Sequence, residues 1–498
     1  MSVSHSRVPE ETVSSGASAA STTGATAAEI DASCRWPLVL LFTSGILWLV
    51  LGTVFALLSE MKIHMPQLAS GPEWLTYGRI RPASANMLLY GFASQAGVGV
   101  ALWLLCRLGR VTLSLQWPVI VAWKLWNIGV TAGVIAILAG FSTGFAWLEI
   151  PGGIAGALFV AAAIFAMSAV ATFAARRDSE THPSQWYLLA AIFWFPWIYS
   201  AANCLLICDP VRGTMQAAVN GWFTGNLVNL WLTPLALAAI FYFLPRLSGI
   251  AIASRQTAAF SFWTLLFLGN LGGLTGLLGG PVPKWMPAVS VGANIALLAA
   301  VVGNLINLRP MCCPVTGCAT PKNEPAYGFI RYSALAYVLL GVLTALTSIP
   351  AVAALTNFTY VTVAKNNLAI HGVAGLVLLG SIYYILPRLL QVNWASECSI
   401  GTHFKLALAG VVLTTIGVGV GGVIQGAKLA NATLPFIDVA RSTFPWVGMH
   451  ILGLILLLVG QAFLLVNLFK LFKSHLQPIA QALCSEWCCA GSKSGVRS

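Results

Sequence analysis

Charged residues are scarce in this chain of 498 residues: only 8% are Asp, Glu, Lys or Arg, whereas 58% are hydrophobic. Soluble domains average about 25% charged residues. This shortage excludes a soluble globular domain, and a mean hydropathy of +0.83 indicates a polytopic membrane protein. No signal peptide is visible, because the first apolar run starts near Pro37 and is too long for one.

Acidic residues and histidines are especially few, with 14 Asp and Glu together and 7 His in the whole chain. No Asp or Glu falls in the middle of an expected membrane helix. Carboxylates inside the membrane usually mark ion or proton pathways. Their shortage therefore counts modestly against a proton pump that depends on such groups.

Apolar segments make up most of what remains. Twelve of them reach the roughly 20 residues that a helix needs to cross a bilayer. The sequence therefore predicts an all-α integral membrane protein with about twelve transmembrane helices. The expected segments are 37–58, 83–105, 117–140, 152–175, 185–205, 217–245, 256–280, 287–308, 330–353, 363–386, 404–424 and 443–469.

The two ends of the chain differ in composition from its centre. Residues 1–33 are rich in Ser, Ala, Thr and Gly and are expected to form a disordered cytoplasmic tail. Residues 34–472 are expected to form one membrane domain. Residues 473–498 are expected to form a second cytoplasmic tail, which contains cysteines.

A net charge of +12 is explained by membrane topology, so we expect the lipid bilayer and no nucleic acid as a partner. With the N-terminus placed inside, seventeen of the 26 Lys and Arg residues lie in the N-terminal tail or after even-numbered helices. Eight lie on the opposite face, and Lys124 lies within a helix. This bias follows the positive-inside rule and predicts that both termini are cytoplasmic.

One predicted helix carries the most informative motif. Residues 355–367 read Leu-Thr-Asn-Phe-Thr-Tyr-Val-Thr-Val-Ala-Lys-Asn-Asn, and residues 383–387 read Tyr-Tyr-Ile-Leu-Pro. The stretch resembles the tenth helix of subunit I of the haem–copper oxidases, specifically the cbb3-type cytochrome c oxidases. Their pattern is Leu-Thr-His-Phe-Thr-Asp-Trp-Thr-Ile-Gly-His-Val-His, followed by Tyr-Tyr-Leu-Val-Pro. The two haem-binding histidines of that pattern fall here at Lys365 and Asn367.

Further motifs resemble the same family in the same order. Residues 78–86 (Gly-Arg-Ile-Arg-Pro-Ala-Ser-Ala-Asn) resemble Gly-Arg-Leu-Arg-Pro-Leu-His-Thr-Asn, which places a haem-ligand position at Ser84. Residues 225–233 (Gly-Asn-Leu-Val-Asn-Leu-Trp-Leu-Thr) resemble His-Asn-Ala-Val-Gly-Phe-Phe-Leu-Thr, which places a copper-ligand position at Gly225. In the seventh helix the resemblance places two copper-ligand positions at Thr275 and Gly276, and the redox tyrosine at Gly269.

The resemblance therefore implies haem b and copper as the family's cofactors, while this chain lacks the six histidines and the tyrosine. Haem iron and copper need imidazole donors at fixed positions. We expect these cofactors to be absent or reduced in number. His371 lies four residues beyond Asn367 on the same helix face and is a candidate substitute ligand, although a lone membrane histidine more often bonds to another helix. Lys365 is either a functional lysine or one that reaches the membrane surface.

Eleven cysteines include two clusters that are both expected on the cytoplasmic side. Disulfides are rare in that compartment. The clusters are candidates for a thiophilic metal ion, although their spacing is not the usual Cys-x-x-Cys; reduced or lipidated thiols are the alternative. The residues are Cys312, Cys313, Cys318, Cys484, Cys488 and Cys489.

Three hypotheses for function follow from the resemblance and from the residues. The first is a relative of cbb3-type subunit I that has lost its redox centres and serves as a scaffold or partner, beside cytochrome c-type subunits, in an oxidase-like complex of a bacterial inner membrane. The second is an active oxidase or nitric oxide reductase with unorthodox ligands. The third is a transporter or channel in the emptied bundle, with Ser84, Thr275, Lys365 and Asn367 lining a wet cavity.

Overall fold

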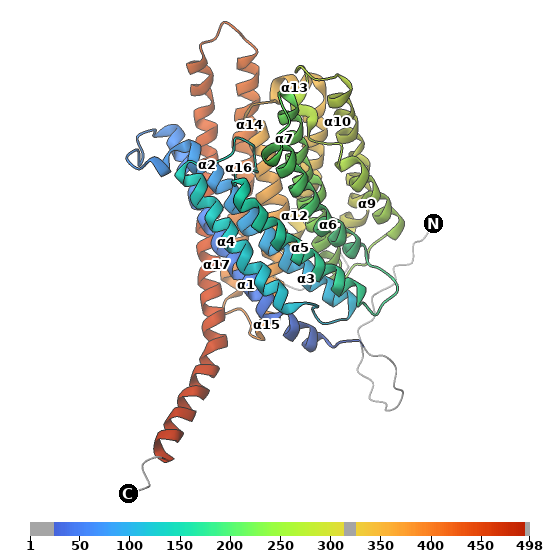
Figure 1. Ribbon diagram of the computed structural model, residues 1–498, viewed down its shortest axis with the longest axis vertical. Coiled ribbons are helices and arrows are strands. Elements are labelled where there is room, and N and C mark those ends of the chain that lie inside the picture. Colours follow the sequence, from blue (N-terminus) through green and yellow to red (C-terminus); the bar gives the residue numbers. More distant parts are fainter. Residues whose placement is uncertain (1–23, 313–324, 494–498) are drawn as a thin grey trace.

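The computed structural model describes residues 24–312 and 325–493, and every regular element within these ranges is a helix. Twelve of the helical stretches are long and apolar enough to cross a membrane, which confirms the predicted number. We number them one to twelve in chain order. Their arrangement as a bundle is shown in Figure 1.

Most spanning helices are single elements. These are helix one, α1 (Ala27–His64); helix three, α4 (Gln116–Ala139); helix four, α5 (Gly152–Ala174); helix nine, α12 (Pro325–Ser348); helix eleven, α16 (Glu397–Leu429); and helix twelve, α17 (Phe436–Lys493). Helices eleven and twelve pack side by side, and α17 extends well past the rest of the bundle towards the C-terminus (Figure 1).

The other spanning helices change geometry along their length. Helices two, six and ten consist of α2 (Tyr77–Asn86), η2 (Met87–Ala93) and α3 (Ser94–Gly109); of α7 (Thr214–Asn226), η4 (Leu227–Leu232) and α8 (Thr233–Ser248); and of α14 (Tyr360–Asn367), η6 (Leu368–Gly375) and α15 (Leu376–Leu390). Helices five, seven and eight consist of α6 (Pro183–Asn203) with η3 (Cys204–Cys208), of α9 (Arg255–Gly269) with η5 (Leu274–Leu277), and of α10 (Trp285–Ala296) with α11 (Leu298–Cys312). Two short elements, η1 (Glu73–Leu75) and α13 (Pro350–Thr356), precede helices two and ten.

Helices two, six and ten form the centre of the bundle. In their most apolar stretches 94%, 83% and 100% of the residues are buried, against 50% or less in every other span. Their runs of apolar residues therefore face protein on all sides, whereas the outer helices expose one side to lipid. A site at the centre of the bundle would therefore draw mainly on these three helices.

The N-terminal boundary differs from the expected one. Residues 27–33 were expected to belong to a disordered tail, but α1 begins at Ala27. Thr26 and Glu29 form a reciprocal capping box, with hydrogen bonds of 2.8 and 3.3 Å between side chain and backbone. Ile30 is buried as well. The cap and this burial offset the entropy cost of ordering the segment. Residues 1–23 lie outside the described ranges.

At the C-terminal end, α17 runs without a break through Lys493, so the described part of the expected tail is helical. No helix end marks the expected boundary at residue 472. Glycines in α16 allow this helix to approach its neighbours closely: a Cβ on Gly421 would lie 2.8 Å from Cβ of Trp446 in α17. Glycine-rich runs in membrane helices typically serve such close helix contacts.

His182 caps the start of helix five outside the membrane, and its Nδ1 accepts a hydrogen bond of 3.2 Å from the backbone N–H of Ser184. Burial, helped by the positive charge of Arg255, lowers the pKa of His182 from 6.5 to about 4. As pH falls through this window the unfolded chain binds a proton before the folded protein does. The stability contributed by neutral His182 is therefore complete above pH 6.5 and declines towards pH 4.

We expect thermal unfolding of the purified protein to show a steeper loss of stability between pH 6.5 and 4 than that of a His182→Asn variant. Asparagine can cap the helix but does not titrate. Melting temperatures of both proteins across this range measure the difference between the two slopes. Because both proteins contain the other histidines, the contributions of those residues cancel. Equal slopes would show that His182 is not held neutral.

Candidate functional site

Each of the three central helices changes from α to π geometry within three residues after a position where we expect a metal ligand from the family pattern. Ser84 is followed by η2, Gly225 by η4, and Asn367 by η6. The segments η2 and η4 each contact η6. Since π segments are rare and are often found at functional sites, this is the region in which a site would be expected.

Ser84 is buried, and its hydroxyl donates a hydrogen bond of 2.9 Å to the backbone oxygen of Gly52 in helix one. Helix one comes close at this level, since a Cβ on Gly52 would lie 3.2 Å from Cβ of Met87. The side chain at the expected haem-ligand position therefore links two helices.

Gly225 lies against the backbone of the segment that follows α9. A Cβ on Gly225 would lie 2.7 Å from Cα of Gly273, and one on Gly221, a turn earlier, would lie 2.8 Å from the carbonyl oxygen of Gly273. Real Cβ atoms do not approach backbone so closely. The expected copper-ligand position is thus filled by main chain, and no side chain fits there without a backbone shift.

Helix seven is not the continuous helix expected over 256–280. The α-helix ends at Gly269, and the chain turns through Gly273, whose φ of +97° favours glycine. Gly269 is itself tightly packed, since a Cβ on this residue would lie only 3.3 Å from Cβ of Asn229. The turn lets the chain pack against helix six at Gly225, which a continuous helix could not do.

Thr275 and Gly276 follow this break and lie in the short helix η5. The carbonyl oxygen of Thr275 accepts a hydrogen bond of 3.0 Å from Nδ2 of Asn357. No heavy atom lies within 4 Å of a Cβ built on Gly276. The turn therefore sets the location of the two expected copper-ligand positions of this helix. The space beside Gly276 is open.

Lys365 is tied to a neighbouring helix, since its Nζ donates a hydrogen bond of 3.0 Å to Oγ1 of Thr347 in helix nine. Asn367 lies beside His450 of helix twelve, with Nδ2 and Nδ1 3.5 Å apart. His450 also contacts the backbone oxygen of Thr414 at 3.1 Å. Sequence reasoning did not assign His450 to this neighbourhood, because its direction depends on how helix twelve packs.

His371 lies in η6 and is only 7% exposed. All residues from 368 to 386 are buried by surrounding protein. Close packing is direct here, since a Cβ on Gly372 would lie 3.3 Å from Cβ of Ala336 in helix nine. A haem coordinated by His371 would need these side chains to move apart.

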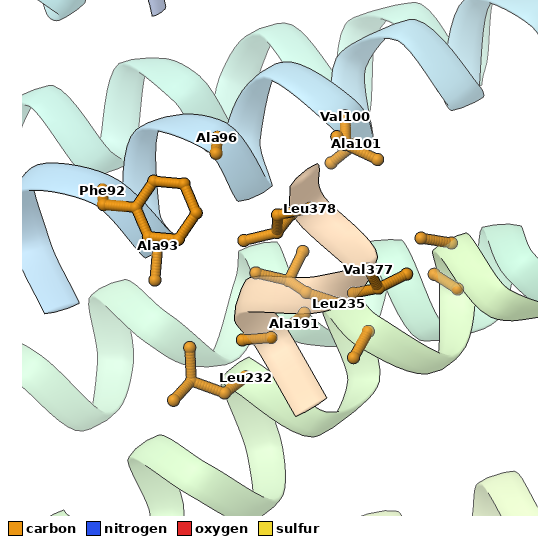
Figure 2. Packing of buried hydrophobic residues seen from close by; sticks show 14 of the residues in the cluster. Phe92, Ala93, Ala96, Val100, Ala101, Ala191, Leu232, Leu235, Val377 and Leu378 are labelled. Atoms are coloured by element: carbon orange, nitrogen blue, oxygen red, sulfur yellow. The ribbon is translucent and has the colours of Figure 1, made fainter. Parts of the chain in front are cut away.

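Beyond His371, towards the C-terminal end of helix ten, apolar side chains fill the centre of the bundle. Figure 2 shows Val377 and Leu378 of helix ten between residues of helices two and six, including Phe92 and Leu235. Such packing matches the density of protein interiors. It leaves helix ten no face open to a pore at this level, and the structure therefore gives the transporter hypothesis no support.

An ion pair that sequence analysis had not singled out lies near the start of helix two. Nη1 of Arg81 is 2.6 Å from Oε1 of Glu60, and Glu60 is 5% exposed. The same guanidinium donates to the Tyr77 hydroxyl at 2.7 Å. Glu60 follows the apolar run of helix one, so only the fold shows that it is enclosed.

The cysteine clusters are only partly described. Cys312 is buried at the end of helix eight. Cys313 and Cys318 lie outside the described residues, and nothing is described of the side chains of Cys484, Cys488 and Cys489. The proposed thiol metal site is therefore neither supported nor contradicted.

The residues of the site do not fit a haem or a copper ion of the family type. Within the described residues, no three His, Cys, Asp or Glu side chains gather where they could hold a metal ion. Main chain occupies the space beside Gly225, and Ser84 is bonded to helix one. What the arrangement supplies is a set of hydrogen bonds between helices.

The fold defines a class: a twelve-helix membrane bundle with helices two, six and ten at its centre. A solved haem–copper terminal oxidase dimer has a chain of the same architecture, with a TM-score of 0.65 and 14% identity, covering 90% of this chain and 84% of that one. At this identity the likeness shows the fold, which is that of haem–copper oxidase subunit I.

The sequence profile described as cytochrome c and quinol oxidase polypeptide I matches residues 37–456, and the chain belongs to this family. Among its relatives, the cbb3-type cytochrome c oxidase subunit CcoN1 of Stutzerimonas stutzeri is 21% identical, over 85% of this chain and 92% of that protein. Cytochrome c oxidase subunit 1 of Rhodobacter capsulatus is 23% identical, over 85% of this chain and 82% of that protein.

Proposed function

We propose that this protein is a redox-silent relative of cbb3-type subunit I that acts as a scaffold or partner subunit in an oxidase-like complex of a bacterial inner membrane, with both termini in the cytoplasm. The observation that carries the proposal is Gly225, where the family pattern has a copper-binding histidine and this chain has main chain of Gly273 in contact distance. Glycine has no donor atom, and the packed backbone leaves no space for one.

A second line of support comes from Ser84 and Asn367. Neither side chain offers the imidazole that holds a low-spin haem, and both side chains already face protein partners. Retention of the whole twelve-helix frame, with its central helices buried, supports a role for the surface of the bundle rather than for its interior. Relatives named as oxidase subunits make cytochrome c-type subunits the expected neighbours.

Purified protein is expected to show no haem bands in a reduced-minus-oxidised spectrum and no copper by elemental analysis. An active haem–copper oxidase purified in the same way is the positive control. Two haems per chain would overturn the proposal. If haem is found, its loss from a His371→Ala variant would identify His371 as the unorthodox ligand and favour an active enzyme.

The scaffold role needs its own test. Affinity purification of the tagged chain from its own membranes, followed by a native gel stained for haem, is expected to recover it with haem-containing subunits. Gene removal is expected to lower the amount of that complex. Recovery of the chain free of such subunits, with no effect of its removal, would contradict the scaffold role even if the chain itself holds no haem.

A further inference from the structure

Helix three carries a charged side chain on its outer surface. Lys124 of α4 is exposed, and it lies inside the apolar segment 117–140 rather than at one of its ends. The helix packs against helices one, two and four, and only 39% of its most apolar stretch is buried. Its remaining side faces the surroundings of the bundle, and Lys124 lies on that side.

The residues that share this side with Lys124 are apolar, with one exception. Side chains three, four or seven positions apart lie on the same face of a helix. At these spacings from Lys124, or one turn further, the exposed residues are Trp117, Val121, Ile128, Thr131 and Ile135. We call these five residues and Lys124 the helix-three face.

The two polar side chains of the helix-three face have no partner in the described part of the chain. Neither Lys124 nor the Thr131 hydroxyl forms an ion pair or a side-chain hydrogen bond with residues 24–312 or 325–493. The inner side of the same helix differs, because Asn127 donates a hydrogen bond of 2.9 Å to Oε1 of Gln95 and accepts one of 2.9 Å from Trp48. Polar groups are therefore satisfied on the inner side and unsatisfied on the outer one.

Lys124 also lies deeper than a lysine that anchors a helix at the membrane surface. Trp117 is 77% exposed at the start of the helix, where aromatic residues mark the edge of the membrane. Lys124 follows seven residues later, which is about 10 Å along the helix axis. A lysine can bend its four-carbon stem back towards water, but this stem covers only part of that distance. The ammonium group therefore stays among apolar neighbours.

At this depth an ammonium group needs a carboxylate. Charged side chains in spanning segments are costly and are almost always paired or turned towards the inside of a bundle. Hydroxyl groups in such segments commonly bond to a neighbouring helix. Lys124 and Thr131 are two helical turns apart, so one helix lying along the helix-three face can contact both side chains.

We propose that the helix-three face binds a spanning helix of a partner subunit, and that this helix places an Asp or Glu side chain against Lys124. The inference rests on the function proposed above, membership of an oxidase-like complex, and it says where on this chain a partner attaches. Opposite charge selects the partner, because a helix without a carboxylate would leave the ammonium group of Lys124 unpaired. The apolar residues of the face pack against the rest of that helix.

Photocrosslinking in the protein's own membranes tests which molecule covers the face. Full-length protein with p-benzoylphenylalanine in place of Ile128, one turn from Lys124, is expected to crosslink to a membrane protein with Asp or Glu in its spanning segment. The same group in place of Ile306 is the control, since Ile306 is exposed on helix eight, which packs against helices seven and nine. Crosslinks from position 128 to lipid alone, or to a protein without such a carboxylate, would overturn the proposal.

Lys124→Met removes the charge and keeps the length of the side chain. Affinity purification of the tagged full-length variant is expected to recover the crosslinked subunit at a level about tenfold lower, because the partner's carboxylate loses its counter-ion. Lys124→Arg should retain most of the recovery. Lys405→Met is the matched control, since Lys405 is exposed on helix eleven at the border of the apolar segment 404–424.

A loss of folding is excluded by the melting temperature of the purified variant. Lys124 has no partner within the described chain, so Lys124→Met is expected to melt no lower than the unaltered protein. Exchanging the two charges, with Lys124→Glu in this chain and lysine at the partner's carboxylate, should restore recovery.

The outcomes separate this inference from the proposed function. Equal recovery of the crosslinked subunit with Lys124→Met and with the unaltered chain would overturn the inference and leave the scaffold role in place. Absence of haem-containing subunits beside the unaltered chain would contradict the scaffold role. The crosslink and the Lys124→Met comparison decide the attachment site in either case.

Discussion

Replacing Gly225 by histidine is expected to destabilise the protein by at least about 3 kcal/mol, because overpacking at this level is costly and here the obstacle is backbone. A Cβ at this position would lie 2.7 Å from Cα and 3.0 Å from N of Gly273. The histidine that the family pattern places here would therefore damage the fold. Melting temperature and the yield of monodisperse protein after detergent extraction measure the effect.

Gly276→His is the matched control, because it restores histidine at another expected copper-ligand position where a Cβ meets nothing within 4 Å. We expect this variant to be nearly as stable as the unaltered protein. Comparable stability of Gly225→His would show that the segment at Gly273 can move aside. In that case, space for a metal ligand would exist after all.

The second large effect is expected at Gly426 in helix eleven. A Cβ there would overlap the carbonyl oxygen of Leu355, which belongs to the short helix that leads into helix ten. Gly426→Ala adds one methyl group yet must displace main chain, so we expect a loss of about 2–3 kcal/mol or failure to fold. Thermal unfolding in detergent measures it.

Gly419→Ala is the control on the same helix, since its Cβ would make an ordinary contact of 3.6 Å with Cβ of Ala364. Its helix propensity should even improve slightly. If Gly419→Ala and Gly426→Ala were equally stable, the close approach at Leu355 would be contradicted. The pair therefore separates the contact itself from the general effect of glycine in a helix.

Gly225 and Gly426 show how little space the interior of the bundle leaves for side chains at these two positions. The resemblance leads us to expect an imidazole at the position of Gly225, and here a Cβ would lie 2.7 Å from Cα of Gly273. Such close packing is typical of protein interiors, which rarely keep large holes. The packing at Gly225 supports our proposal of a scaffold role.

Much of the fold could be predicted from the sequence. The twelve spans follow from apolar runs, because in a membrane each run must satisfy its own backbone hydrogen bonds and so forms a helix. The family followed from short motifs whose order and spacing resemble its pattern, and the match over residues 37–456 confirms it.

The errors lay where local sequence is a weak guide. The expected tail at 27–33 is helical because Thr26 caps it and Ile30 finds a buried site. The expected helix at 256–280 ends at Gly269 because the chain gains a contact with helix six. The burial of Ile30 and the contact with helix six both depend on partners far away in the chain.

The sequence by itself therefore determined the membrane class and the number of helices, since hydropathy belongs to single residues and short runs. Only the tertiary structure decided that backbone fills the space at Gly225, that Lys365 bonds to Thr347, and that Arg246 of helix six bonds to Tyr384 of helix ten. These features join residues tens to hundreds of positions apart. Their geometry is set by helix packing, which no local pattern in a single sequence encodes.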